Sequence, residues 1–204
     1  QTVIQIPIDV SLGKVDVLLN LGADYIDQNG ITQQYLRDFI YSFDISLHQS
    51  GFPIALGSQL KPSPVVVDFN NDGLLDVLIG DYLGLVHWFD GDGSEVSDST
   101  FPYDTGNQIW GSPSAADLDN DGNIDVAVSS KSKSLYIFDQ YGLKAEYFAN
   151  SYLMGSPAIG QLDDDDELEV VIGGYSSSGK KIYAINSDGS DVEGFPIDVG
   201  EKMI

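Results

Sequence analysis

Two nine-residue segments place carboxylate and amide side chains at alternating positions, a spacing that can surround a metal ion. The first Asp loop is Asp68–Asp76 and the second Asp loop is Asp117–Asp125, and both fit D-x-[DN]-x-D-G-x-x-D. Oxygens at positions 1, 3 and 5 can curl around one cation, while the carbonyl of position 7 and the carboxylate of position 9 complete its shell. The predicted ligands are Asp68, Asn70, Asp72, Leu74 (carbonyl) and Asp76 in the first loop, and Asp117, Asp119, Asp121, Asn123 (carbonyl) and Asp125 in the second.

The ligand types in these loops favour calcium. Glycine at position 6 permits the positive φ of a sharp turn. Five or more oxygens from a flexible loop suit the large coordination shell of Ca²⁺ better than that of Mg²⁺, and the lack of nearby His and Cys disfavours zinc. Position 12, where an EF-hand has a bidentate Glu, is Ile79 in one loop and Val128 in the other. The sequence therefore predicts two calcium sites in loops between strands.

Two further segments keep part of this pattern. The third Asp loop, Gln161–Glu169, has a neutral Gln at position 1 and Asp166 in place of the glycine. Asp tolerates the left-handed region better than most residues do, so the same turn is expected there. Whether an ion binds stays open, and its candidate ligands are Gln161, Asp163, Asp165, Glu167 and Glu169. A fourth segment, Asp9–Asp16, is one residue shorter and offers few oxygens, so we expect that it has lost its metal.

The loops belong to a repeat that runs through the chain. An aromatic or aliphatic residue followed by Asp or Asn recurs at offsets of 46, 49 and 47 residues, and a phenylalanine marker recurs at 49, 47 and 47. A strand motif of the type Leu-Asp-Val-Leu-Ile follows each Asp loop. The first marker ends at Asp44, Asp90, Asp139 and Asn186, and the second lies at Phe52, Phe101, Phe148 and Phe195.

Each repeat is predicted to form four short strands, because β-branched and aromatic runs alternate with Gly, Asn, Asp and Ser clusters. Four-stranded units with a period of this length are typical of a β-propeller. The sequence thus predicts an all-β propeller, or a segment of a larger one, with blades at 1–60, 61–108, 109–150 and 151–199. A two-sheet sandwich is the alternative fold. Only Thr32–Phe39, in the first blade, shows a helical pattern.

These motifs resemble the FG-GAP/VCBS repeat family, the blade type also found in integrin α-subunit propellers. The resemblance is strongest in Ser63–Asp90, Gly111–Asp139 and Gly155–Asn186, where Ser-Pro leads into an Asp loop, an Asp-Val or Glu-Val strand and the aromatic or aliphatic marker. It implies calcium in the loops that join the two inner strands, on the face opposite most ligand sites, with the ligands named above. A long insertion at Gly22–Asp38 departs from the family pattern and is expected to be a local decoration or a partner contact.

A ligand face, if present, must be built from the loops at the other ends of the strands. These include 80–84, 104–111, 149–155 and the insertion. Aromatic side chains in such loops can bind sugars or proteins, although they also pack between blades. The candidate ligand face consists of Tyr82, Trp110 and Tyr152.

The composition excludes several classes of function. Acidic residues outnumber basic ones by 32 to 9, giving a net charge of −23, so a nucleic acid would be repelled. With no cysteine, thiol catalysis, zinc–thiolate sites and disulfides are ruled out. No apolar run approaches the length of a membrane span, and no G-x-S-x-G motif occurs. His87 alternates within a strand and is expected to pack rather than to catalyse.

These observations predict a non-enzymatic, calcium-stabilised propeller of an extracellular or cell-surface protein, acting in adhesion, binding or assembly. Its expected partners are a protein or carbohydrate at the cell surface, or further copies of itself. Two alternatives stay open. One is a carbohydrate-binding propeller attached to a secreted polysaccharide-degrading enzyme, and the other is a structural module of a surface filament.

Overall fold

The computed structural model describes residues 13–45, 51–175 and 181–200. The chain divides into two units, Gln1–Ser50 and Gly51–Ile204, and each is considered by itself. The segment Asp9–Asp16, predicted to have lost its metal, lies mostly outside the described residues. The part of the chain that the structure describes contains no helix with the length and hydropathy needed to cross a bilayer.

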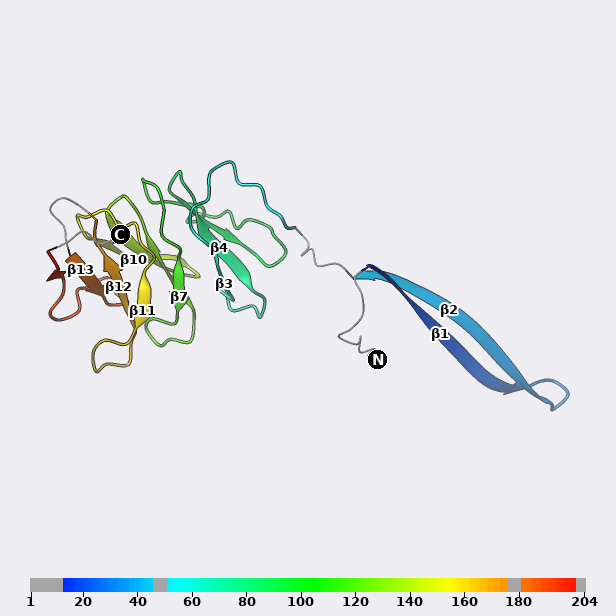
Figure 1. Ribbon diagram of the computed structural model, residues 1–204. Helices are drawn as coiled ribbons and strands as arrows, with labels where there is room; N and C mark the ends of the chain where they lie inside the picture. The colour runs from blue at the N-terminus through cyan, green and yellow to red at the C-terminus, as the bar shows by residue number, and fades with distance from the viewer. Residues whose placement is uncertain (1–12, 46–50, 176–180, 201–204) are drawn as a thin grey trace. The chain divides into compact units, whose positions relative to one another are not determined.

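The first unit is a long antiparallel hairpin (Figure 1). Strands β1 (Gly13–Ile26) and β2 (Thr32–Ile45) pair without a register shift from Gly13↔Ile45 to Ile26↔Thr32. The turn at its tip is closed by the Asp27 carboxylate, which accepts the backbone N–H groups of Asn29 and Ile31.

This hairpin corrects two predictions for the first repeat. The described residues of 1–60 form two strands of fourteen residues instead of a four-stranded blade, and Thr32–Phe39 is strand instead of helix. The insertion Gly22–Asp38 explains the difference, because its two arms pair with each other and prolong the sheet, as Gly22↔Leu36 shows. In this antiparallel pair, alternate residues of the two arms exchange backbone hydrogen bonds across the hairpin.

The second unit contains three four-stranded antiparallel sheets, each a simple meander (Figure 1). The predicted all-β architecture of four-stranded propeller blades is confirmed in this unit. The first sheet is β3 (Val65–Val67), β4 (Asp76–Gly80), β5 (Leu85–Phe89) and β6 (Tyr103–Asp104). The second is β7 (Ser114–Ala116), β8 (Asp125–Ser129), β9 (Ser134–Asp139) and β10 (Gly142–Phe148), and the third is β11 (Ala158–Gly160), β12 (Glu169–Gly173), β13 (Lys181–Ile185) and β14 (Ile197–Asp198).

The second sheet is buried on both faces, because it packs between the other two. Successive side chains of a strand point to opposite faces. On β8, Val126 and Val128 join a core cluster with the first sheet, whereas Ala127 joins a cluster with the third. On β9, Phe138 belongs to the cluster with the first sheet and Ile137 to the cluster with the third. This face-to-face series of sheets is the packing of propeller blades.

A chain of serines links the first strands of the three sheets. The N–H of Ser63 donates to Oγ of Ser112 at 2.9 Å, and the N–H of Ser112 donates to Oγ of Ser156 at 2.9 Å. Each serine precedes the proline that leads into an Asp loop. These hydrogen bonds hold the start of each sheet's first strand against that of the next sheet. The three Asp loops, which follow these strands, therefore lie at corresponding positions.

Asp81, which follows β4, organises the opposite end of the first sheet. One of its oxygens, Oδ1, accepts the N–H groups of Leu83, Gly84 and Leu85 at 2.8–2.9 Å, and the residue is almost fully buried. Burial alone would raise the pKa of Asp81, but hydrogen bonds from Leu85, Ser58 and Gly84 lower it below the usual value.

Replacing Asp81 with alanine is expected to lower the free energy of unfolding by about 2–4 kcal/mol, because three N–H groups lose their acceptor. In the native chain this contribution is present above the ordinary Asp pKa and is lost as pH falls through the lowered folded pKa. Thermal melts of both proteins from pH 7 to pH 3 should therefore converge in acid. Asp92→Ala, which removes an exposed acceptor for Ser94, is the control, and an equal loss there would contradict the prediction.

Candidate metal centre

The three Asp loops connect the first and second strands of the three sheets. The first lies between β3 and β4, the second between β7 and β8, and the third between β11 and β12. In every case the acid at position 9 is the first residue of the second strand and is at least 98% buried. The strand therefore anchors one carboxylate while the loop carries the others.

The first and second loops share one backbone conformation. Position 4 is left-handed in both, with φ of 60° at Asn71 and 58° at Asn120, and the glycines at position 6 have φ of 87° and 91°. Such values suit Asn and Gly because these residues tolerate this region. In both loops the position 1 carboxylate accepts the N–H groups of positions 5 and 6 at 2.9–3.0 Å. The loop is thus folded around its own carboxylates.

Asp76 places a buried carboxylate in the first loop. Its Oδ2 accepts the N–H of Phe69 at 3.1 Å, but its Oδ1 is buried without any hydrogen-bond partner. Burial raises the pKa of Asp76, and the negative charges of Asp90 and Asp72 add to this rise. Within the described residues no lysine or arginine pairs with an acid of this loop. A buried carboxylate among other acids is stabilised by a positive partner or by protonation.

The second loop gathers its acids more tightly and already contains a cation. Ligand oxygens of Asp117, Asp119 and Asp125 lie within 4.8 Å of one another. The Lys144 ammonium is 2.6 Å from Oδ2 of Asp119 and 3.0 Å from Oδ1 of Asp125. Burial lowers the pKa of Lys144, but its contacts with Asp119 and Asp125 more than offset this and raise it above its usual value.

The third loop also forms a cluster, but by a different turn. Oxygens of Asp163, Asp165 and Glu169 lie within 4.8 Å of one another, and Oε1 of the fully buried Glu169 has no partner. The expectation of a left-handed residue at position 6 is wrong, since Asp166 does not have a positive φ. The physical reason is the Cβ of Asp, which disfavours a region that Gly73 and Gly122 enter freely.

Gln161 fills part of the third cluster. Its amide Nε2 donates to the backbone carbonyl of Asp165 and, at 3.0 Å, to that of Glu167. The Glu167 side chain turns away and accepts a hydrogen bond from Ser187. Of the five predicted ligands, the structure therefore clusters Asp163, Asp165 and Glu169, whereas Gln161 acts as a hydrogen-bond donor.

Two residues that add charge to the Asp loops were missed by the sequence reasoning, Asp90 and Lys144. Asp90 directly follows β5 and adds negative charge beside the first loop. Its signal in the sequence was the recurring marker, in which an acid or amide lies at the end of the third strand or directly after it. Lys144 gave no signal, because the residue lies 19 positions after Asp125 and nothing in the pattern relates the two.

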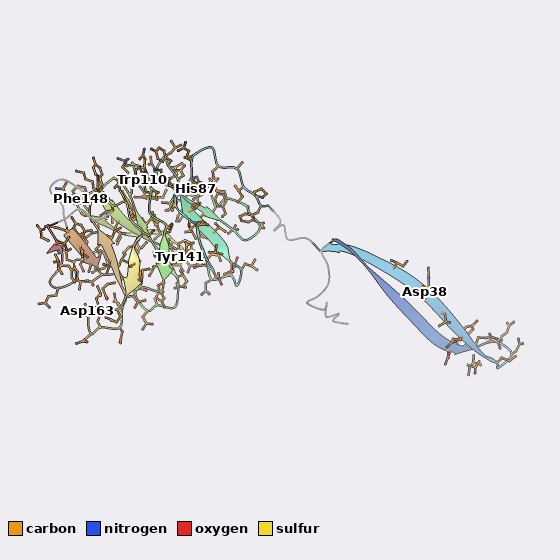
Figure 2. All side chains as sticks on the ribbon, in the orientation of Figure 1. Asp38, His87, Trp110, Tyr141, Phe148 and Asp163 are labelled. Carbon is orange, nitrogen blue, oxygen red and sulfur yellow. The ribbon has the colours of Figure 1, made fainter. Side chains whose placement is uncertain are left out.

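At the opposite ends of the strands, aromatic side chains surround a cavity of about 390 Å³. Trp110 and Tyr152 line it together with Lys131 and Tyr175, whereas Tyr82 does not. The Lys61 ammonium lies 3.5 Å from the centre of the Trp110 ring and 5.4 Å from that of Tyr82. Figure 2 shows Trp110 and Asp163 at opposite ends of the sheets. Two of the three predicted ligand-face residues therefore meet in one cavity, away from the Asp loops.

A family model described as an FG-GAP-like repeat matches residues 68–128. The match begins at the first ligand of the first Asp loop and includes the whole of the second. The segment that holds the first two Asp loops is therefore similar to an FG-GAP repeat. Both Asp loops in the matched segment have the shared backbone conformation, and the third loop, outside it, has the different turn.

Two crystal structures of BBS1N in complex with ARL6DN, one soaked with mercury and one with lead, match 75% and 74% of this chain at 15% and 17% identity. Their TM-scores are 0.48 and 0.49. The chain spans less than half of those chains, 42% and 46% of their lengths. No curated protein matches the sequence.

Proposed function

We propose that this chain is a non-catalytic, calcium-stabilised propeller module of an extracellular or cell-surface protein that binds a partner or assembles with further modules. The observation that carries the proposal is the buried, unpartnered Oδ1 of Asp76 inside a loop of oxygen ligands. A bound Ca²⁺ would supply the positive charge that this oxygen lacks. Asp68, Asn70, Asp72 and the carbonyl of Leu74 would hold the ion together with Asp76.

The calcium chemistry supports the proposed location. Extracellular calcium modules bind with dissociation constants of about 10⁻⁴–10⁻³ M, a range filled only where calcium is abundant. The twenty-six aspartates also give a strongly anionic surface, which favours solubility and opposes non-specific association with other polyanions.

The only buried histidine of the described residues has a packing environment. His87 stacks on Phe89 with 6.0 Å between ring centres, and its Nδ1 lies 2.6 Å from Oε1 of Glu95. Its Nε2 is 3.6 Å from Asp81, the residue that organises the neighbouring turn. We therefore assign His87 a structural role.

Calcium binding is tested by thermal unfolding in EDTA, in calcium and in magnesium. Calcium at a hundredfold excess over its dissociation constant should stabilise the fold by about 2.7 kcal/mol and raise the melting temperature by roughly 5–10 °C. Magnesium should have a smaller effect, because it dehydrates reluctantly and demands an octahedral shell. Equal melting temperatures in EDTA and in calcium would contradict the proposal.

The aromatic cavity favours carbohydrate binding as the second candidate function. The rings of Trp110 and Tyr152 line the cavity, and Asn107 and Lys131 offer polar groups to the hydroxyls of a sugar. Saturable binding on a glycan array, weakened about tenfold or more by Trp110→Ala, is expected if this function holds. Tyr141→Ala is the control, because Tyr141 is 82% exposed and lies outside the cavity. Equal loss in both variants would argue against a site at Trp110.

A further inference from the structure

Lys144 is an extra residue that a β-bulge inserts into the second sheet. In the first sheet Phe89 faces Glu95, and the next residue, Val96, donates its N–H to the Trp88 carbonyl. The third sheet repeats this step, with Ile185 opposite Asp191 and Val192 bonded to Ala184.

In the second sheet one additional residue lies between the two residues that pair with the neighbouring strand. Phe138 faces Leu143, but Ile137 faces Ala145, and Lys144 is left between them at the register shift. Val96 in the first sheet and Val192 in the third occupy the position of Ala145, and both are apolar and buried or partly buried. A bulge of this kind changes the direction of one side chain, and such bulges are commonly found beside functional sites.

The bulge directs the Lys144 ammonium into the second Asp loop. Nζ contacts Oδ2 of Asp119 at 2.6 Å and both oxygens of Asp125 at 3.0 and 3.1 Å. These acids, with Asp117, are the cluster that would hold a metal ion. Three hydrogen bonds to the carboxylates use the donors of the ammonium, so its contacts resemble the inner shell of a bound cation.

The other two loops have no such group. In the described part of the chain, neither the first nor the third loop forms an ion pair with a lysine or arginine. Each keeps a buried carboxylate oxygen without a partner, Oδ1 of Asp76 and Oε1 of Glu169. In the second loop the acid at the same position, Asp125, has both oxygens hydrogen-bonded, and the buried oxygen without a partner is instead Oδ1 of Asp119.

We propose that Lys144 is a built-in cation that occupies the centre of the second Asp loop and makes this loop independent of calcium, while the first loop depends on it. This inference rests on the proposed calcium function and refines it. Calcium enters the second loop only by displacing the lysine, so its affinity there is weaker than the sequence pattern implies. The two loops, alike in sequence, thus differ in their response to calcium.

The test uses the whole chain with the first loop disabled by Asp76→Asn. Calcium binding to Asp76→Asn and to Asp76→Asn/Lys144→Met is measured by isothermal titration calorimetry, and the third loop is the same in both proteins. Removing the ammonium should add a site or strengthen calcium binding by about tenfold or more, since a close, partly buried positive charge no longer opposes the ion. Asp76→Asn/Lys133→Met is the control, because Lys133 contacts Asn150 and not the loop.

A second readout separates the failure of this inference from that of the calcium function. In EDTA, Lys144→Met should melt several degrees below the wild type, and calcium should restore it, because the ion replaces the lost charge. Equal calcium affinity in the two double variants would overturn the inference even if the wild type binds calcium. If no variant binds calcium, the proposed function fails, and an unchanged melting temperature of Lys144→Met in EDTA would then also overturn the role of Lys144 as a built-in cation.

Discussion

Phe101→Ala is expected to lower the free energy of unfolding by about 3–5 kcal/mol, the usual cost of emptying a buried aromatic site. Phe101 is only 2% exposed and lies at the centre of the cluster between the first and second sheets. Its ring is 5.5 Å from the ring centres of Trp88 and Phe138, which belong to the two different sheets. Alanine would remove one ring that contacts both sheets and leave a cavity.

Urea denaturation, with calcium held constant, measures this loss as a shift of the midpoint at unchanged slope. The matched control is Phe148→Ala, at the phenylalanine of the next repeat, which is 63% exposed (Figure 2). It should cost less than about 1 kcal/mol, as for most surface changes. Comparable midpoints for the two variants would show that Phe101 does not join the sheets as the structure indicates.

Asp76→Asn is the second change with a large expected effect, and its sign depends on calcium. The amide keeps an oxygen that can accept the Phe69 N–H but removes a buried negative charge. Without calcium we expect the variant to be at least as stable as the wild type, because the carboxylate lacks a cation. With calcium in hundredfold excess, the variant should lose up to about 2.7 kcal/mol of ion-dependent stabilisation.

Melting curves of the two proteins in EDTA and in calcium check this reversal. Asp98→Asn serves as the control, since Asp98 caps an exposed turn through Thr100 and Phe101 and lies outside all three Asp loops. An equal calcium response of wild type and Asp76→Asn would exclude the first loop as a calcium site. A variant less stable than the wild type in EDTA would show that the Asp76 charge is already compensated without an ion.

The repeat predicted much of the second unit correctly because its signals are local. The Leu-Asp-Val-Leu-Ile motif, apart from its first residue, lies in the second strand of each sheet, at β4, β8 and β12. The loops between these strands are set by Asn, Asp and Gly at fixed spacing, and backbone hydrogen bonds to a neighbouring carboxylate need no distant partner.

The first repeat shows where the same reasoning failed. Its first marker, which ends at Asp44, lies in β2. The pattern could not show that the arms of the insertion would pair with each other, because pairing depends on residues far apart along the strands. A helical period over eight residues was too short to outweigh fourteen cross-strand pairs.

By itself the sequence determined the four-stranded units of the second unit and the conformation of the first two Asp loops, since turn residues and alternating strands act through near neighbours. Only the tertiary structure decided which carboxylates are buried without a partner, that Lys144 enters the second loop, and that Trp110 and Tyr152 share a cavity. These features bring together residues from different strands and sheets. Their energies come from burial and from contacts between charges that are distant in the sequence. The spacing of residues along the chain does not indicate either.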